Sequence, residues 1–210
     1  MEKLAETKYD IHELLKGRWS PRAFSTRSVE PEKLFSLFEA ARWSPSGGNS
    51  QPWSFVVTTS DQPEHEKLVE ALAGFNKVWA KNVPVLILAV ARPNPERPGS
   101  EAYAYDDLGQ SVAHMSIQAE AVGLQVHQMG GFDRDQVREL FEIPESFKPL
   151  TVIAIGYSGR VEDLPEPLQE REVQTRTRKP LSEFVFGGHW DLPIEPTAEE
   201  LLLAGSPDGK

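Results

Sequence analysis

Two near-continuous apolar runs constrain the fold of this chain more than any other feature of its sequence. The first extends from Val83 to Ala91, with Pro84 inside it, and the second from Pro149 to Tyr157. Neither run alternates between apolar and polar residues, which is typical of strands that are covered on both faces. We therefore expect both runs to form strands buried within one sheet.

Other strand and helix patterns alternate along the chain. A capping box at Asp10–Glu13 predicts a short helix that ends at Gly17. Further strands are predicted at 53–59 and 124–129, and further helices at 31–43, 64–72, 103–122 and, after an N-cap at Asp133, up to Phe141. This alternation predicts an α/β or α+β sandwich around one sheet.

The length of 210 residues favours a single domain, covering residues 1–210. The longest apolar run is far below the roughly 20 residues that a membrane span needs, and the first residues do not resemble a secretory signal. The chain has no cysteine, which excludes disulfides and thiol catalysis. Its net charge of −10 disfavours nucleic-acid binding. A cytoplasmic protein is expected.

The stretch from Ser158 to Lys210 differs in character from the rest of the chain. It is rich in proline and charge, yet it also contains large apolar residues, among them Phe184, Phe186 and Trp190. A disordered tail normally carries less apolar surface. We expect an extended arm, covering residues 180–210, that lies on a partner subunit in a homodimer.

A polar loop extends from Ser44 to Trp53, between a helix pattern and a strand pattern. It contains two prolines and two adjacent glycines and carries no charge. Gly47 and Gly48 let the backbone approach a ligand closely, and the neighbouring hydrogen-bonding side chains are those of Ser46, Asn49, Ser50 and Gln51. Such a loop suits a neutral heterocycle with carbonyl and imide edges; the alternative is an ordinary polar turn.

Two pairs of arginines lie far apart in the sequence. In Arg18-Trp19-Ser20-Pro21-Arg22, the proline favours an extended backbone, so the side chains of Arg18, Ser20 and Arg22 point to one side. Two guanidinium groups and a hydroxyl suit a phosphate. Arg176-Thr177-Arg178 repeats the spacing. The alternative for each pair is a solvated basic stretch with surface salt bridges.

Several familiar motifs are absent from the sequence. It contains no G-x-G-x-x-G, no G-x-x-x-x-G-K-[ST] and no G-x-S-x-G, and its five histidines lack metal-ligand spacing, so no metal site is expected. The polar loop and the two arginine pairs fit one ligand with a neutral ring at one end and a phosphate at the other. Flavin mononucleotide (FMN) has that shape.

Together with Gly130-Gly131-Phe132-Asp133, these motifs resemble the FMN-dependent nitroreductase family, in the same order and from about Asp10 to Pro180. The resemblance implies an α+β three-layer sandwich, in which helices flank a central mixed, mainly antiparallel sheet. It also implies a homodimer with exchanged C-terminal arms and two FMN sites at the interface.

The resemblance implies a role for each motif. Arg18, Ser20 and Arg22 would hold the phosphate and ribityl end, joined by Arg176 and Arg178. Ser46, Asn49 and Gln51 would come from the other subunit, Asn76 would lie beside the flavin pyrimidine, and Gly130 and Gly131 near N5. The full set implied to contact FMN is Arg18, Trp19, Ser20, Arg22, Pro45, Ser46, Gly47, Asn49, Gln51, Asn76, Met129, Gly130, Gly131, Arg176 and Arg178.

Two positions depart from the family pattern. Trp79 stands where members often have a lysine, and Gly130 aligns with a frequent glutamate. His127 lies close to the glycines, where it either faces the substrate pocket or is a structural histidine.

The activity that the resemblance implies is ping-pong hydride transfer from NAD(P)H, through FMN, to a small-molecule acceptor such as a nitroaromatic or quinone. One alternative is a flavin oxidase, dehydrogenase or flavin-consuming enzyme that does not use NAD(P)H. Another is a non-catalytic flavin-binding module.

Overall fold

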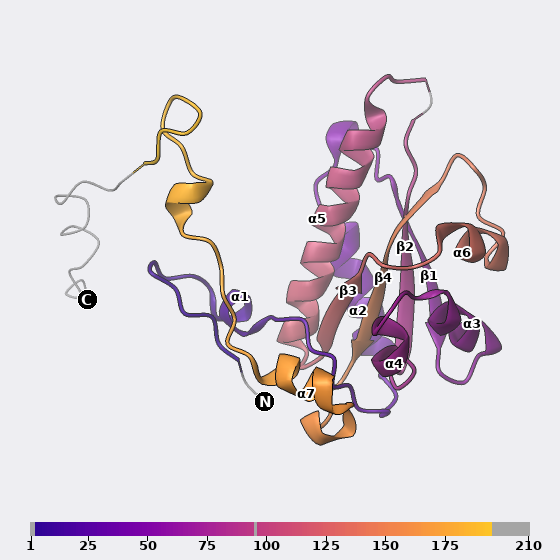
Figure 1. Cartoon of the computed structure of the whole chain (residues 1–210). Coiled ribbons are helices and arrows are strands. Elements are labelled where there is room, and N and C mark those ends of the chain that lie inside the picture. The colour runs from indigo at the N-terminus through magenta and orange to yellow at the C-terminus, as the bar shows by residue number, and fades with distance from the viewer. Residues whose placement is uncertain (1–2, 95, 195–210) are drawn as a thin grey trace. The chain divides into compact units, whose positions relative to one another are not determined.

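A four-stranded antiparallel sheet, in the order β1-β2-β4-β3, lies at the centre of the structure (Figure 1). The computed structural model describes residues 3–94 and 96–194. The strands are β1 (Trp53–Thr59), β2 (Val85–Ala91), β3 (Gln125–Met129) and β4 (Lys148–Gly156). The two near-continuous apolar runs are β2 and β4, the two inner strands, as predicted, and all three described pairings are antiparallel.

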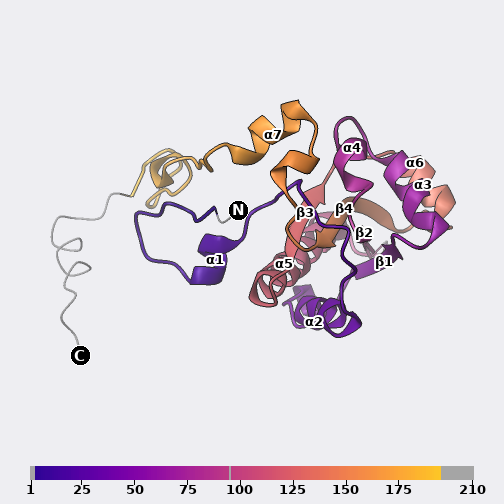
Figure 2. The same cartoon turned by 90° about the horizontal axis from the view of Figure 1, so that it is seen from below.

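Helices cover both faces of this sheet (Figures 1 and 2). One face carries α2 (Pro31–Arg42) and the long α5 (Ser100–Ala121); the other carries α3 (Pro63–Ala71), α4 (Asn76–Ala80) and α6 (Arg134–Leu140). The predicted α+β sandwich is therefore confirmed. Two further helices, α1 (Glu13–Gly17) and α7 (Glu166–Val173), precede and follow these layers in the sequence.

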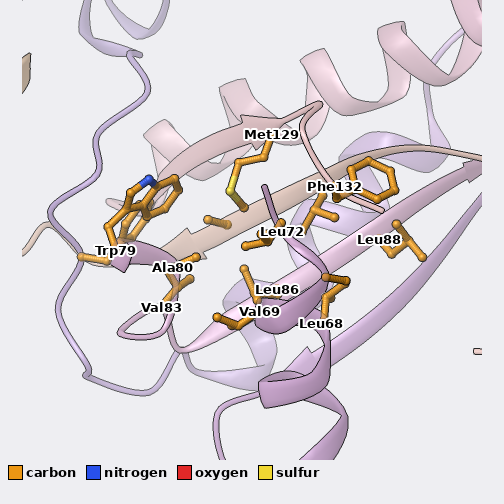
Figure 3. Packing of buried hydrophobic residues seen from close by; sticks show 14 of the residues in the cluster. Leu68, Val69, Leu72, Trp79, Ala80, Val83, Leu86, Leu88, Met129 and Phe132 are labelled. Carbon is orange, nitrogen blue, oxygen red and sulfur yellow. The ribbon is translucent and has the colours of Figure 1, made fainter. Parts of the chain in front are cut away.

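A hydrophobic core lies on each side of the sheet, because successive residues of a strand face opposite sides. Along β2, Val85, Ile87 and Ala89 join the cluster under α2 and α5. The intervening residues join the cluster under α3 and α4, where Trp79 lies beside Ala80 and Val83 (Figure 3).

Two predictions about the N-terminal half were wrong in detail. Asp10 does not cap α1, because its carboxylate pairs with Lys16 at 2.8 Å. His12 is the N-cap instead, and its Nδ1 accepts a hydrogen bond from the Leu14 N–H at 3.2 Å. The segment after Phe75, expected as a link, forms the short helix α4.

The stretch after Tyr157 begins within the core, before the predicted arm starts at residue 180. Leu164 and Leu168 are buried in the core beneath α3 and α4, and α7 forms with Pro167 in its first turn, where proline is tolerated. The chain divides into two compact units, Met1–Gln174 and Thr175–Lys210, and α7 ends the first.

The described part of the second unit is small. Its residues 185–194 form a tight turn in which Gly187 N–H donates to Leu192 O at 2.7 Å and the rings of Phe186 and Trp190 lie 5.2 Å apart. The rest of the predicted arm, residues 195–210, lies outside the described residues.

Candidate functional site

The segment from Arg18 to Arg22 is irregular, with a bend at Arg22, and it leads from α1 to a bridge between Phe24 and Ser158. Trp19, Pro21 and Ala23 line one small hollow together with Gly159 and Glu172. Arg18, Ser20 and Arg22 do not line this hollow. The bend at Arg22 interrupts the extended backbone that was predicted for this segment.

A buried glutamate holds this segment in place. Glu172, on α7, is 1% exposed, and its Oε1 accepts hydrogen bonds from the main-chain N–H groups of Arg22 at 2.7 Å and Ala23 at 3.0 Å. Its Oε2 lies 3.7 Å from Arg22 Nη1. Glu172 was not predicted as a site residue, although its spacing of four residues from Leu168 places both side chains on one face of a helix.

His127 and Trp79 contact the same segment and Phe24, which lies shortly after it. His127 Nδ1 donates to the Pro21 carbonyl at 2.7 Å, and the His127 ring lies 4.7 Å from the ring of Trp79. Trp79 is 1% exposed and stacks on Phe24 at 5.8 Å. These contacts give both side chains structural roles. Trp79 also carries no charge, unlike the lysine that the family resemblance leads one to expect at this position.

Burial lowers the pKa of His127 to about 4, against the partly opposing hydrogen bond to Pro21. The folded state thus holds this ring neutral, whereas the unfolded chain binds its proton near pH 6.5. The resulting stability is fully present above pH 6.5 and is lost as the pH falls toward 4. Between pH 7 and pH 5 the loss from this group is about 2 kcal/mol.

We expect H127Q, whose amide still donates to Pro21, to lose less stability over that interval than the wild type. Urea unfolding at pH 7 and pH 5 measures the difference. Equal losses in the two proteins would contradict the lowered pKa.

The glycine turn after β3 lies against the start of α4. Gly131 O accepts a hydrogen bond from Ala73 N–H at 2.8 Å, and a Cβ on Gly131 would lie 3.8 Å from Asn76 Nδ2. Met129 is buried, whereas Gly130 and Gly131 are exposed. A Cβ on Gly130 would meet nothing within 4 Å, so the surface above it is open. The structure thus brings Asn76 and both glycines together.

Trp79 joins this turn to the arginine segment, because it lies one helical turn after Asn76 and contacts His127, which in turn binds Pro21. The two groups of residues therefore form one continuous region on the first unit.

Helix α5 anchors the polar loop. The Asp107 carboxylate accepts from Gly47 N–H at 3.2 Å, and Ser44 Oγ and His114 Nδ1 share a hydrogen bond of 2.5 Å. Within the loop, Gln51 N–H donates to Ser46 Oγ at 3.1 Å. Four of the predicted contact residues are exposed and Ser46 is half-buried; the exposed ones are Pro45, Gly47, Asn49 and Gln51.

The polar loop and the arginine segment contact α5 at different places. The loop contacts Asp107 through Gly47 and His114 through Ser44, whereas Gly17, next to Arg18, packs against Glu120 near the end of the helix. At 1.5 Å per residue, Asp107 lies about 20 Å from Glu120 along the helix and His114 about 9 Å. The glycine part of the loop is therefore the part that lies away from the arginine segment in one copy of the chain.

Arg176 and Arg178 belong to the second unit. Arg176 is half-buried, and Arg178 is exposed, with its Nη1 donating to the Thr177 carbonyl at 2.7 Å. This hydrogen bond of Arg178 lies within that unit.

Two classes of site have no support in the part of the chain that the structure describes. No cluster of three or more His, Cys, Asp or Glu side chains there is arranged to hold a metal ion. None of the helices found in residues 3–94 and 96–194 has the length and apolar character to cross a membrane.

Comparison with known proteins gives consistent matches. The profile of the Nitroreductase family matches residues 15–78 and 72–157. A crystal structure described as "the oxidoreductase containing FMN" is 35% identical, with a TM-score of 0.82 over 88% of this chain and 95% of that one. A nitroreductase family protein from Clostridium difficile 630 is 29% identical, with a TM-score of 0.67 over 84% and 96% of the two chains.

A curated relative from Archaeoglobus fulgidus bears the name "Putative NADH dehydrogenase/NAD(P)H nitroreductase". It is 29% identical over 157 residues, which cover 71% of this chain and 86% of that protein.

Proposed function

Because the chain belongs to the nitroreductase family, we propose that it is an FMN-dependent oxidoreductase whose cofactor sites are each formed by two copies of the chain. The observation that carries this proposal is the separation along α5. In one copy, the residue that anchors Gly47 and the residue that Gly17 packs against lie about 20 Å apart along this helix. A second copy that presents its own loop completes the site.

The residues on the first unit fit an FMN molecule. Arg18, Ser20 and Arg22 lie within one short segment and offer two guanidinium groups and a hydroxyl as donors to a phosphate. Asn76 offers an amide beside Gly131, at the ring end of the same region. The open surface above Gly130 admits a flat ring without a side chain in its way. We place Trp19 and Met129 among the residues around the cofactor, and Arg176 and Arg178 at its phosphate.

The partner's polar loop supplies the remaining contacts in this proposal, through Pro45, Ser46, Gly47, Asn49 and Gln51. Helix α2 leads into the loop; its Phe35 is 70% exposed, and Trp43, the C-cap that follows it, is 73% exposed. Such apolar side chains suit an interface. The arm, residues 180–210, would add its own apolar surface to the partner.

Bound FMN would supply the redox chemistry, taking a hydride from NAD(P)H and, in a separate half-reaction, passing electrons to a nitroaromatic or quinone-like acceptor. The chain's residues bind and orient the reactants. The open surface above Gly130 suits the ping-pong order that we propose, in which donor and acceptor would occupy the same place in turn. Asn76 would donate its amide hydrogen bond to the ring edge.

The test is the visible absorption spectrum of the purified protein, followed by anaerobic addition of NADH or NADPH. Flavin bands that bleach support the reductase. Bands that persist favour a flavin enzyme with another electron source or a non-catalytic flavin-binding module. If no bands appear even after FMN is added, the proposal is wrong.

The anchor of the polar loop gives a further prediction. D107A removes the acceptor of the Gly47 N–H, so the loop loses its fixed geometry and FMN should bind about tenfold more weakly, the value of one charge-assisted hydrogen bond. Fluorescence titration measures the dissociation constant. D106A, which removes the neighbouring exposed carboxylate, is the control and should bind FMN as the wild type does. Equal affinities for both variants would count against the loop's role.

A further inference from the structure

We infer that Glu172 is a positioning residue for the phosphate of FMN, and that it acts through Arg22. This inference rests on the proposed function, because it assigns the buried carboxylate of α7 to the same cofactor site. Nothing in the sequence motifs points to Glu172, which lies 150 residues after the segment that it binds.

Glu172 is a buried carboxylate, and its burial requires partners for both oxygens. A carboxylate that is 1% exposed costs free energy unless its oxygens have partners. Oε1 has two, the main-chain N–H groups of Arg22 and Ala23. These two bonds fix the main chain of the arginine segment at the residue that carries the guanidinium.

The other carboxylate oxygen of Glu172, Oε2, lies near the side chain of Arg22. Oε2 has no hydrogen-bond partner among the described residues, and it lies 3.7 Å from Arg22 Nη1. This distance gives an ion pair without a closed hydrogen bond. The ion pair orients the guanidinium of Arg22, and the N–H donors of Arg22 stay available to a second anion.

Glu172 is itself held in place by its neighbours. Lys3 Nζ donates to its main-chain carbonyl at 2.6 Å, and Leu168, one turn earlier on α7, is 1% exposed in the core. On the other side, Gly159 N–H donates to Ala23 O at 2.8 Å. The carboxylate is therefore fixed relative to both the core and the arginine segment, as a supporting residue of a binding site must be.

The decisive variant is E172Q. Its amide oxygen still accepts from both main-chain N–H groups, which preserves the fold, but its amide NH₂ replaces Oε2 and repels the guanidinium of Arg22. Dissociation constants are measured for FMN and for riboflavin, which lacks the phosphate. The FMN constant should rise about tenfold and the riboflavin constant by less than about twofold, since one charge-assisted contact is worth about 1.4 kcal/mol.

Two controls separate positioning from a general loss of structure. E170Q changes an exposed glutamate on the same helix and should leave both constants unchanged. The double variant E172Q/R22A should bind FMN no more weakly than R22A alone, because the two side chains act as a unit.

The outcomes are distinct. If R22A loses the preference for FMN over riboflavin while E172Q keeps it, the role of Glu172 is wrong and the proposed site stands. Equal weakening of both ligands in E172Q also overturns the positioning role. If the wild type shows no preference for FMN over riboflavin, both this inference and the phosphate assignment fail.

Discussion

The double variant R18A/R22A is expected to purify without FMN. Each guanidinium contributes charge-assisted hydrogen bonds worth about 1.5–3 kcal/mol to a phosphate. Loss of both should weaken FMN binding by a factor of about 10² to 10⁴. The ratio of visible to ultraviolet absorbance of the purified protein reports the flavin content directly.

The matched control for this variant is R160A. Arg160 is exposed and pairs with Asp163, three residues later in the same turn, so its loss removes one positive charge and leaves the proposed site untouched. R160A should purify with as much flavin as the wild type. A double variant R18A/R22A that carries stoichiometric FMN would refute the phosphate assignment.

The second large effect is on stability. W79A should lower the free energy of unfolding by about 3–5 kcal/mol, because it removes a fully buried indole and leaves a cavity between Phe24 and His127. For a chain of this size the melting temperature should fall by about 6–20 °C. Thermal unfolding followed by circular dichroism measures the change.

V78A is the control on the same helix. Val78 is 37% exposed, so its truncation removes little buried surface and should lower the melting temperature by no more than a few degrees. A W79A protein as stable as V78A would mean that Trp79 is not the core residue described above.

The sequence was sufficient to predict the centre of the fold. The near-continuous apolar runs identified β2 and β4 because strands inside a covered sheet are apolar on both faces. Short elements were harder to predict. Helices α4 and α7 were missed because neither begins with a side-chain N-cap, so nothing local marks its start, whereas the equally short α1 and α6 follow capping residues.

The candidate site was predictable to the same extent. Local motifs identified the polar loop, the arginine segment and the glycine turn, since each needs particular residues close together in sequence. Their anchors were missed, because Asp107 and Glu172 meet their partners 60 and 150 residues away. The distance between the loop and the arginine segment along α5 was likewise not predictable, because it depends on where each segment contacts the helix.

That distance has a genetic consequence. In the proposed dimer, each site combines the arginine segment of one copy with the loop of the other. A dimer of one copy that is defective only in its loop and one defective only in its arginine segment would have one site with both defects and one with neither. Two inactive alleles would then complement each other, and mixed dimers would keep half of the wild-type complement of cofactor.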